Sequence, residues 1–195
     1  KVSSMKKNEN LIQIYLIRHG EAEKSWDEDS DPGLSDLGKQ QSKEIIEIMI
    51  EELRGKEFRV LTSPLKRAQQ TAMPLQKFTG INIEIDETFA EIPSPGIPLK
   101  ERKEWLKNLF DKNLRSFEGV QENWRQLILK KIPSINQNTV IFTHFMVINC
   151  LVSWLENKET MVNFYPDNCS ITKLEISNGL VRLSKKGEEL KTIVQ

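Results

Sequence analysis

The sequence is poor in the residues that mark several common classes of protein. It contains only two cysteines among 195 residues, and neither Cys150 nor Cys169 lies in a Cys-x-x-Cys pair. This argues against a disulfide framework or a cysteine-rich zinc site, so we expect two buried or half-buried free thiols in a reducing compartment. No apolar run approaches the roughly 20 residues that a membrane-spanning helix needs. We therefore expect a cytoplasmic protein that does not bind membranes.

An excess of charge of either sign is also absent. Lys and Arg total 28, as do Asp and Glu, so the formal net charge is zero. This balance argues against nucleic-acid binding through overall basic charge, while a local basic pocket for a small anion is compatible with it. The length and the 38% of hydrophobic residues are typical of one globular domain. We predict a disordered or tag-derived start over residues 1–10 and a single domain over residues 11–195; no pattern specifies an oligomeric state.

Strand-like apolar runs alternate with helical patterns along the chain. Strands are predicted at residues 11–17, 58–61, 81–85, 139–143, 170–176 and 180–183. Helices are predicted at residues 35–54, from 64 onward, and at 99–110, 117–132 and 145–155. Pro74 should bend or end the second helix, and Asn178-Gly179 predicts a hairpin between the last two strands. This order indicates an α/β fold with three α/β/α layers and a mostly parallel central sheet.

The only two histidines follow predicted strands. His19 lies two residues after the first strand, and His144 directly follows the fourth. Ligands of open α/β sheets bind beyond the carboxyl ends of the strands. Arg18 precedes His19, and Arg67 lies in the first turn of the helix after the second strand, where guanidinium groups can hold phosphate oxygens. Each residue taken singly is more typical of a structural role, but together they indicate an anion site.

Acidic residues supply candidates for proton transfer. Glu91 begins a proline-rich loop after the third strand, where it could reach the site as a proton donor or remain a solvated loop acid. Glu21 is the next candidate. The acidic segment 21–31 has no spacing typical of a calcium loop, so we interpret it as a solvated loop and expect neither a metal nor a cofactor.

These residues lie within motifs that resemble one known family. Residues 16–21, Leu-Ile-Arg-His-Gly-Glu, resemble the Arg-His-Gly signature of the histidine phosphatase superfamily, also called phosphoglycerate mutase-like. The resemblance covers most of the chain in the right order. Further segments similar to the family are the opening of its first helix at 31–38, its second-arginine motif at 62–72, its acid site at 89–91 and its second-histidine strand at 140–144.

The resemblance implies a role for each candidate residue. His19 would be the nucleophile that becomes phosphohistidine. Arg18, Arg67 and His144 would bind the phosphoryl oxygens, and Glu91 would protonate the leaving oxygen and then activate water. The implied reaction is hydrolysis of a small phosphorylated substrate or a phosphoprotein, with no metal or cofactor.

The chain departs from the family pattern at several positions. Phe145 follows His144, where many members have glycine. Lys24 and Ser25 stand where glycolytic mutases carry Trp and Asn. The sequence after Glu91 is Ile-Pro-Ser-Pro-Gly-Ile-Pro rather than the common Gly-x-Trp-Glu-Gly.

Two other functions remain open at this point. A phosphoglycerate mutase is one alternative, although such mutases carry a longer insertion that shields the phosphoenzyme. A regulatory or binding protein that kept the fold without catalysis is the other. Residues 91–125, with Trp105, Trp124 and several basic residues, are predicted to form a specificity cap.

Overall fold

A six-stranded sheet forms the centre of the protein. The computed structural model describes residues 10–190; residues 1–9, which carry most of the predicted disordered start, and residues 191–195 lie outside the described part. The strand order is β3-β2-β4-β1-β5-β6. The strands are β1 (Ile12–Arg18), β2 (Arg59–Thr62), β3 (Ile83–Ile85), β4 (Thr139–Thr143), β5 (Ile171–Ser177) and β6 (Leu180–Lys185). The first four are mutually parallel and the β5–β6 hairpin is antiparallel, which confirms the mostly parallel sheet.

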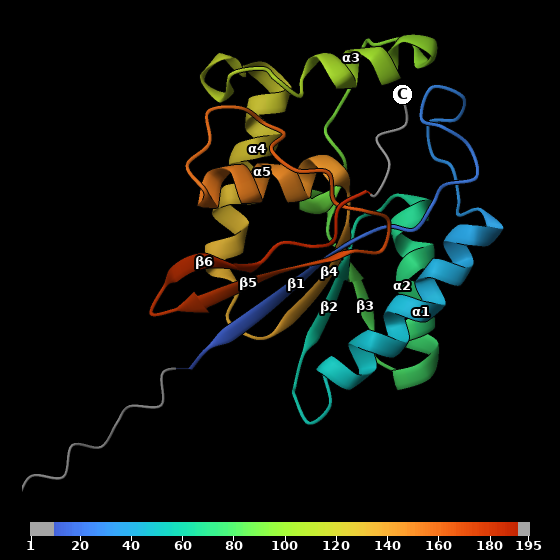
Figure 1. Ribbon diagram of the computed structural model, residues 1–195, viewed down its shortest axis with the longest axis vertical. Helices are drawn as coiled ribbons and strands as arrows, with labels where there is room; N and C mark the ends of the chain where they lie inside the picture. Colours follow the sequence, from blue (N-terminus) through green and yellow to red (C-terminus); the bar gives the residue numbers. More distant parts are fainter. Residues whose placement is uncertain (1–9, 191–195) are drawn as a thin grey trace, which may run out of the picture.

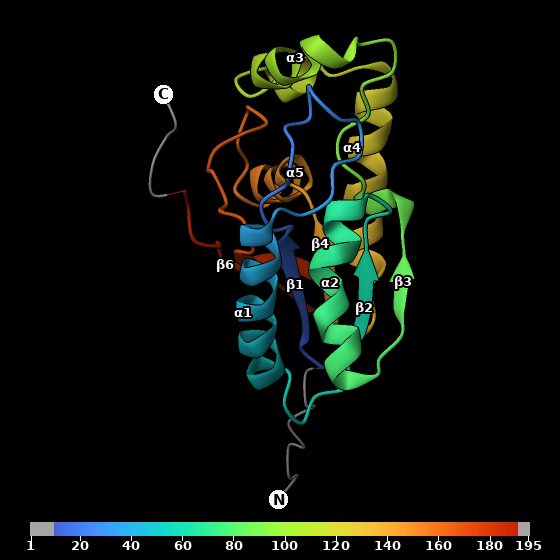
Figure 2. The same ribbon diagram turned by 90° about the vertical axis from the view of Figure 1, so that its right-hand side faces the viewer.

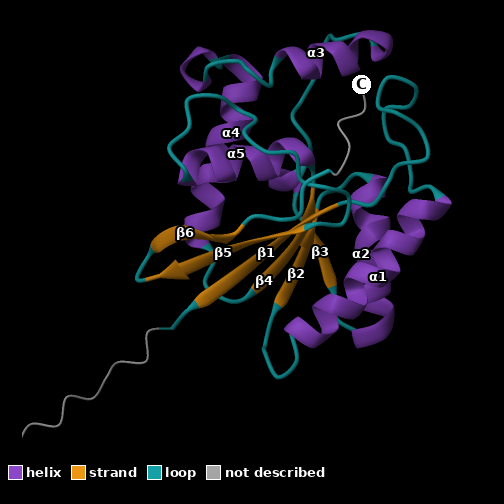
Figure 3. Cartoon of the chain, in the orientation of Figure 1, coloured by secondary structure: helices purple, strands orange, loops and turns teal. Residues whose placement is uncertain are grey.

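Helices cover both faces of this sheet. They are α1 (Asp36–Glu52), α2 (Lys66–Thr79), α3 (Arg102–Asn108), α4 (Gly119–Lys131) and α5 (Phe145–Leu155). Figure 1 shows α1 and α2 on one face and α4 and α5 on the other, and Figure 3 shows the same layers by secondary structure. The three-layer α/β/α prediction is therefore confirmed. Among residues 10–190, every helix is too short or too polar to span a lipid bilayer.

The alternation of side chains along β1 explains the two layers of helices. Ile14 and Leu16 are fully buried in a core shared with α4 and α5. Tyr15 and Ile17 are fully buried in a second core shared with α1 and α2. Successive strand residues point to opposite faces, so a strand that is apolar at every position must be covered on both sides.

The parallel strands all end at the same side of the molecule. Their arrowheads point toward the end where α3 lies, as Figure 2 shows for β1, β2 and β3. Helix α3 is preceded by a short 3-10 turn (Leu99–Glu101) and follows the proline-rich loop. The fold thus places the carboxyl ends of β1, β2 and β4 beneath a helical cap.

The sequence predicted that Pro74 bends or ends the second helix, and the structure shows that the helix does not end there. Helix α2 continues through Pro74 to Thr79, where Gly80 ends it in a left-handed conformation with φ of 71°. Burial of Ala68, Ala72 and Leu75 against the sheet holds the helix together across the proline. The Asn178-Gly179 hairpin is confirmed, with positive φ at both residues (50° and 77°) as such turns require.

Candidate active site

The pairing of β1 with β4 brings the two histidines together. Arg18 is opposite Thr143 in the parallel register, and the His19 amide donates to the Thr143 carbonyl oxygen at 3.0 Å. The next residues along both strands are His19 and His144, whose ring centroids are 5.2 Å apart. Both side chains are buried. The predicted meeting of the histidines at the carboxyl edge of the sheet is confirmed.

Hydrogen bonds define the tautomer of His19. Its Nδ1 lies 2.7 Å from the carbonyl oxygen of Gly20, which can only accept, so Nδ1 carries the proton. The Arg67 Nε donates to His19 Nε2 at 3.1 Å, which requires a lone pair on that nitrogen. Burial, followed by the charges of Arg67 and Arg18, lowers the pKa of His19 well below 6.5. The ring is therefore neutral, with the lone pair of Nε2 on the side of Arg67.

Gly20 permits the turn that places His19. A Cβ at Gly20 would lie 2.6 Å from the Gly38 carbonyl oxygen at the start of α1. The Gly20 amide also donates to Thr71 Oγ1 at 3.0 Å, and that hydroxyl donates to the Arg67 carbonyl oxygen at 2.7 Å. A side chain at Gly20 would therefore push the residues that follow β1 away from the start of α1.

Two arginines surround His19 with donors that lack partners. Arg67 is 5% exposed, and its Nη1 has no hydrogen-bond acceptor within the described residues. Arg18 Nη1 donates to the Pro166 carbonyl oxygen at 2.9 Å, while its Nε has no acceptor there. Buried donors in proteins nearly always have a partner. These two groups are therefore suited to an anion that carries several oxygens.

His144 offers a third such group. Its Nε2 lies 2.7 Å from Ser63 Oγ, and its Nδ1 has no partner among residues 10–190. Ser63 is placed here because β2 pairs with β4, and the Ser63 amide continues that pairing to Phe142. Burial, then the charges of Arg67, His19 and Arg18, lowers the pKa of His144 well below 6.5. Neutral His144 can donate from Nδ1 when Ser63 donates to Nε2.

Glu91 lies at the same site, next to the start of α5. Its Oε1 accepts from the Ile92 amide at 3.0 Å and its Oε2 from the Met146 amide at 3.4 Å. Burial raises the pKa of Glu91 above its usual value, against these hydrogen bonds and the charges of both arginines. Glu21 is exposed and accepts from Ser35 Oγ at 2.8 Å instead. Of the two candidate acids, only Glu91 lines the cavity at the histidines.

A cavity of about 420 Å³ opens at Arg18, His19, Arg67 and Glu91, which line its inner end. This size is typical of sites for small molecules. His144 is fully buried beside His19 and does not itself line the cavity. The cap contributes Lys103, Leu106, Lys107 and Phe110, and Trp105 packs against Trp26 with ring centroids 6.4 Å apart. The predicted cap is thus present over its first half, whereas Trp124 is buried in the core.

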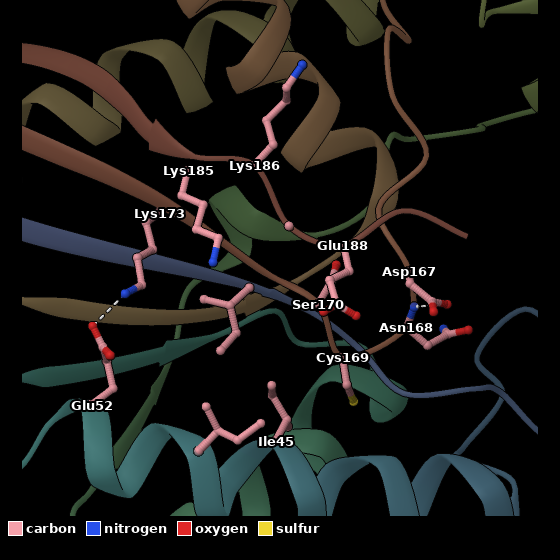
Figure 4. Close-up of a pocket in the computed structure, with 13 residues that line it drawn as sticks. Ile45, Glu52, Asp167, Asn168, Cys169, Ser170, Lys173, Lys185, Lys186 and Glu188 are labelled. Atoms are coloured by element: carbon pink, nitrogen blue, oxygen red, sulfur yellow. Dashed lines mark hydrogen bonds and ion pairs between the residues drawn. The ribbon is translucent and has the colours of Figure 1, made fainter. Parts of the chain in front are cut away.

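A second cavity, of about 340 Å³, lies between α1 and the β5–β6 hairpin (Figure 4). Its charged lining includes Lys173, which forms an ion pair with Glu52 at 2.5 Å. Cys169 also lines it, and burial raises the pKa of this thiol to about 12. Its lining includes neither of the two histidines, nor Arg67 or Glu91, so this cavity is separate from the candidate site. Cys150 and Cys169 are both buried free thiols, as expected.

Metal-binding groups are not clustered in the part of the chain that the structure describes. Between residues 10 and 190, no set of three or more His, Cys, Asp and Glu side chains is arranged to hold an ion. The positive charges at the site come from arginine and lysine side chains.

The sequence did not predict the residues that hold the backbone of the site in place by hydrogen bonds. The Asn168 side chain donates to the His19 carbonyl oxygen at 3.1 Å, and the Cys169 amide donates to that of Arg18 at 2.9 Å. Trp124 Nε1 donates to the Ala90 carbonyl oxygen at 2.9 Å and so anchors the loop before Glu91. These contacts join residues more than 30 positions apart, so no local sequence pattern marks them.

Comparisons with known proteins agree with this geometry. A protein of Escherichia coli named as the probable phosphoglycerate mutase GpmB is 25% identical over 200 residues, which cover 87% of each chain. The structure of Bacillus stearothermophilus YhfR aligns with a TM-score of 0.73 at 20% identity, over 92% of this chain and 98% of that one. The alpha-ribazole phosphatase of Shigella flexneri aligns with a TM-score of 0.69 at 20% identity, over 91% and 96%.

These structural neighbours share the fold at low sequence identity. The sequence model of the histidine phosphatase superfamily, branch 1, matches residues 14–188, a span that includes both histidines, both arginines and Glu91. The chain therefore belongs to the histidine phosphatase superfamily.

Proposed function

We propose that the protein hydrolyses a phosphomonoester through a phosphohistidine intermediate on His19. The observation that carries this proposal is the fixed tautomer of His19. Its proton is held on Nδ1 by Gly20, and the lone pair of Nε2 lies next to Arg67. A neutral imidazole nitrogen beside a phosphate-binding guanidinium is what attack on phosphorus needs.

Arg18, Arg67 and His144 would bind the phosphoryl group. Each has a buried nitrogen without a hydrogen-bond partner among the described residues. The phosphoryl oxygens share the charge of the transition state, so donors that are already in place stabilise it. When substrate binds, Arg67 Nε would donate to a phosphoryl oxygen instead of His19 Nε2, which frees the lone pair of that nitrogen. As Nε2 of His19 then forms the N–P bond, the P–O bond to the leaving group breaks.

Glu91 would supply the proton in this first step. The raised pKa keeps more of its carboxyl group protonated than an exposed glutamic acid would be, and the proton passes to the leaving oxygen. In the second step the Glu91 carboxylate takes a proton from water as the water oxygen attacks phosphorus. The N–P bond then breaks, and inorganic phosphate and neutral His19 result.

A phosphoglycerate mutase remains the second candidate because of the name given to the Escherichia coli relative. Mutase activity returns the phosphoryl group to a second hydroxyl of the substrate rather than to water. Incubation with 3-phosphoglycerate tests the mutase, since a mutase yields the isomeric phosphoglycerate and the proposed phosphatase does not.

The experiment that tests the proposal traps the intermediate. Enzyme is mixed with ³²P-labelled substrate and quenched rapidly into alkali, in which a phosphohistidine is stable. Peptide mapping should locate the label on His19. The His19→Ala variant should lose both label and turnover, whereas His144→Ala should turn over more slowly and retain some label.

Label on a cysteine, serine or aspartate would overturn the assignment, as would full turnover by His19→Ala. A panel of phosphoesters that gives no turnover and no label at any pH would instead favour a non-catalytic member of the fold. Circular dichroism of both variants serves as the control for folding.

A further inference from the structure

Three aromatic rings form one wall of the active-site cavity. Phe110, Phe145 and Tyr165 all line it. The Phe110 and Phe145 rings are stacked with centroids 5.3 Å apart, and Tyr165 lies 6.1 Å from Phe110 and 5.8 Å from Phe145. Tyr165 is 41% exposed, so this part of the wall is accessible to a ligand.

This wall begins at the phosphate-binding residues. The Arg18 guanidinium lies over the Phe145 ring, 5.3 Å from its centroid. Phe145 follows His144 directly. A group attached to the phosphoryl oxygen would therefore meet an aromatic surface within the first few atoms of the leaving group.

The backbone holds the wall in place. The Val162 amide donates to the Phe110 carbonyl oxygen at 3.1 Å. The Tyr165 carbonyl oxygen accepts from the Leu190 amide at 2.9 Å, and the Tyr165 amide donates to Glu189 Oε1 at 3.0 Å. A wall ordered before binding loses little conformational entropy when a ligand docks.

The charges of the cavity exceed what one phosphoryl group needs. Among residues 10–190, its lining includes Arg18 and Arg67 at the inner end and a single acid, Glu91. The exposed residues Lys103 and Lys107 from the cap and Lys24 from the 20–36 loop also line it. A phosphoryl dianion balances the two arginines. None of the three lysines forms an ion pair with a described residue. Lys103 is nevertheless near Asp27, whose pKa is lowered by a hydrogen bond from Ser25 and also by the charge of Lys103, so Lys24 and Lys107 are the lysines without such an acidic neighbour among the described residues.

We propose that the substrates are phosphomonoesters whose leaving alcohol carries a flat apolar group and, beyond it, a second anionic group. The flat group packs on the wall of Phe110, Phe145 and Tyr165, and the anionic group faces the lysines of the cap. This inference rests on the proposed function and specifies its substrate class. A short hydroxy acid such as phosphoglycerate leaves the aromatic wall unused.

Three synthetic substrates with similar leaving-group basicity test the proposal. They are ethyl phosphate, 2-phenylethyl phosphate and 2-(4-carboxyphenyl)ethyl phosphate. We expect kcat/KM to rise about tenfold with the ring and about fivefold more with the carboxylate, the second rise being lost at high salt. Because all three are alkyl esters, leaving-group chemistry does not produce the ranking.

Variants assign each gain to its residues. Tyr165→Ala should remove most of the gain from the ring, and so should Phe110→Leu, which keeps an apolar side chain where alanine could destabilise the fold. Lys103→Ala combined with Lys107→Ala should remove only the gain from the carboxylate. Phe78→Ala and Lys77→Ala, both on the exposed side of α2, are the matched controls and should preserve the ranking.

Equal kcat/KM for the three substrates, with label still on His19, would overturn this substrate assignment while the proposed hydrolysis stands. A gain from the ring without a gain from the carboxylate would overturn the anionic part. Absence of both turnover and label with all three substrates, and with an aryl phosphate, would overturn the proposed function and this inference together.

Discussion

Glu91 is subject to two opposed influences. The Ile92 and Met146 amides and the charges of two arginines favour its carboxylate form, whereas burial favours the protonated form and dominates. A carboxyl group with a raised pKa that lines the same cavity as His19, the proposed nucleophile, is suited to general acid catalysis near neutral pH.

Replacing Glu91 with glutamine should slow turnover most for poor leaving groups. Alkyl phosphates require protonation of the departing oxygen and should lose about 10²- to 10⁴-fold in kcat. Aryl phosphates need little protonation and should lose far less. The wild-type rate should also fall as pH rises through the raised pKa of Glu91, and Glu91→Gln should lack that decline. The measurement is kcat across a series of leaving groups and pH values; equal losses across the series would remove Glu91 from the role.

At the residue scale, the sequence was informative where short motifs follow strands. Arg18, His19 and His144 could be placed because the chain position after a parallel strand defines an edge of the sheet. Asn168 and Tyr165 could not, because they reach the site from a loop more than 140 residues after His19. Contacts of that sequence separation leave no local pattern.

At the scale of elements, α2 shows tertiary packing overcoming a local preference. Proline removes a backbone donor and crowds the preceding turn, so the sequence predicted a bend or an end at Pro74. The helix nevertheless runs for 14 residues, because its inner face is buried against the sheet and α1. Packing stabilises the helix by more than the proline costs.

Replacing Pro74 with alanine should therefore stabilise the protein. The new amide can donate to the carbonyl oxygen one turn earlier, and we expect a gain of about 1–2 kcal/mol, less than the full proline penalty because alanine also loosens the unfolded chain. Urea unfolding of both proteins measures this. Gly80→Ala is a matched contrast that should destabilise, since Gly80 has a positive φ of 71°. An unchanged or lower urea midpoint for Pro74→Ala would mean that contacts of the proline ring stabilise the folded protein by at least as much as the missing hydrogen bond costs.

In the cap region, the sequence predicted the helices but not their positions in the fold. The helical segments between residues 99 and 132 were predicted, and α3 and α4 are found there. The sequence did not predict that these two helices have different positions. Helix α3 covers the cavity, whereas α4 packs into the core through Trp124 and Ile128. Both helices carry apolar and basic residues, so composition alone does not separate a cap from a layer.

At the scale of the whole molecule, periodicity was enough to predict the layers. The runs of buried residues in β1 and β4 require cover on both faces, and the helices between the strands provide it. The site then follows from topology, because β1, β4 and β2 are neighbours whose carboxyl ends meet. The same burial that builds the core also encloses two histidines, and this has a consequence for stability.

The protein should lose stability as pH falls below about 6.5. Both His19 and His144 have a folded-state pKa well below 6.5, mainly through burial. Above that pH both are neutral in the folded and unfolded states, and their contribution is fully present. Below it the unfolded chain binds two protons that the folded protein does not, so the free energy of unfolding falls by about 1.4 kcal/mol per pH unit for each histidine. The raised pKa of Glu91 acts in the opposite direction over part of this range.

The double variant His19→Asn, His144→Asn isolates this effect. Asparagine keeps a polar side chain at each position but does not titrate. Between pH 6 and pH 5 the wild type should lose about 2 kcal/mol more than the double variant, measured by urea unfolding at each pH. Each single variant should show about half of this additional loss of unfolding free energy, since it retains one histidine that is protonated only in the unfolded chain. Parallel pH profiles for wild type and double variant would show that the histidines are not held neutral, and would also remove the basis for a neutral nucleophile at His19.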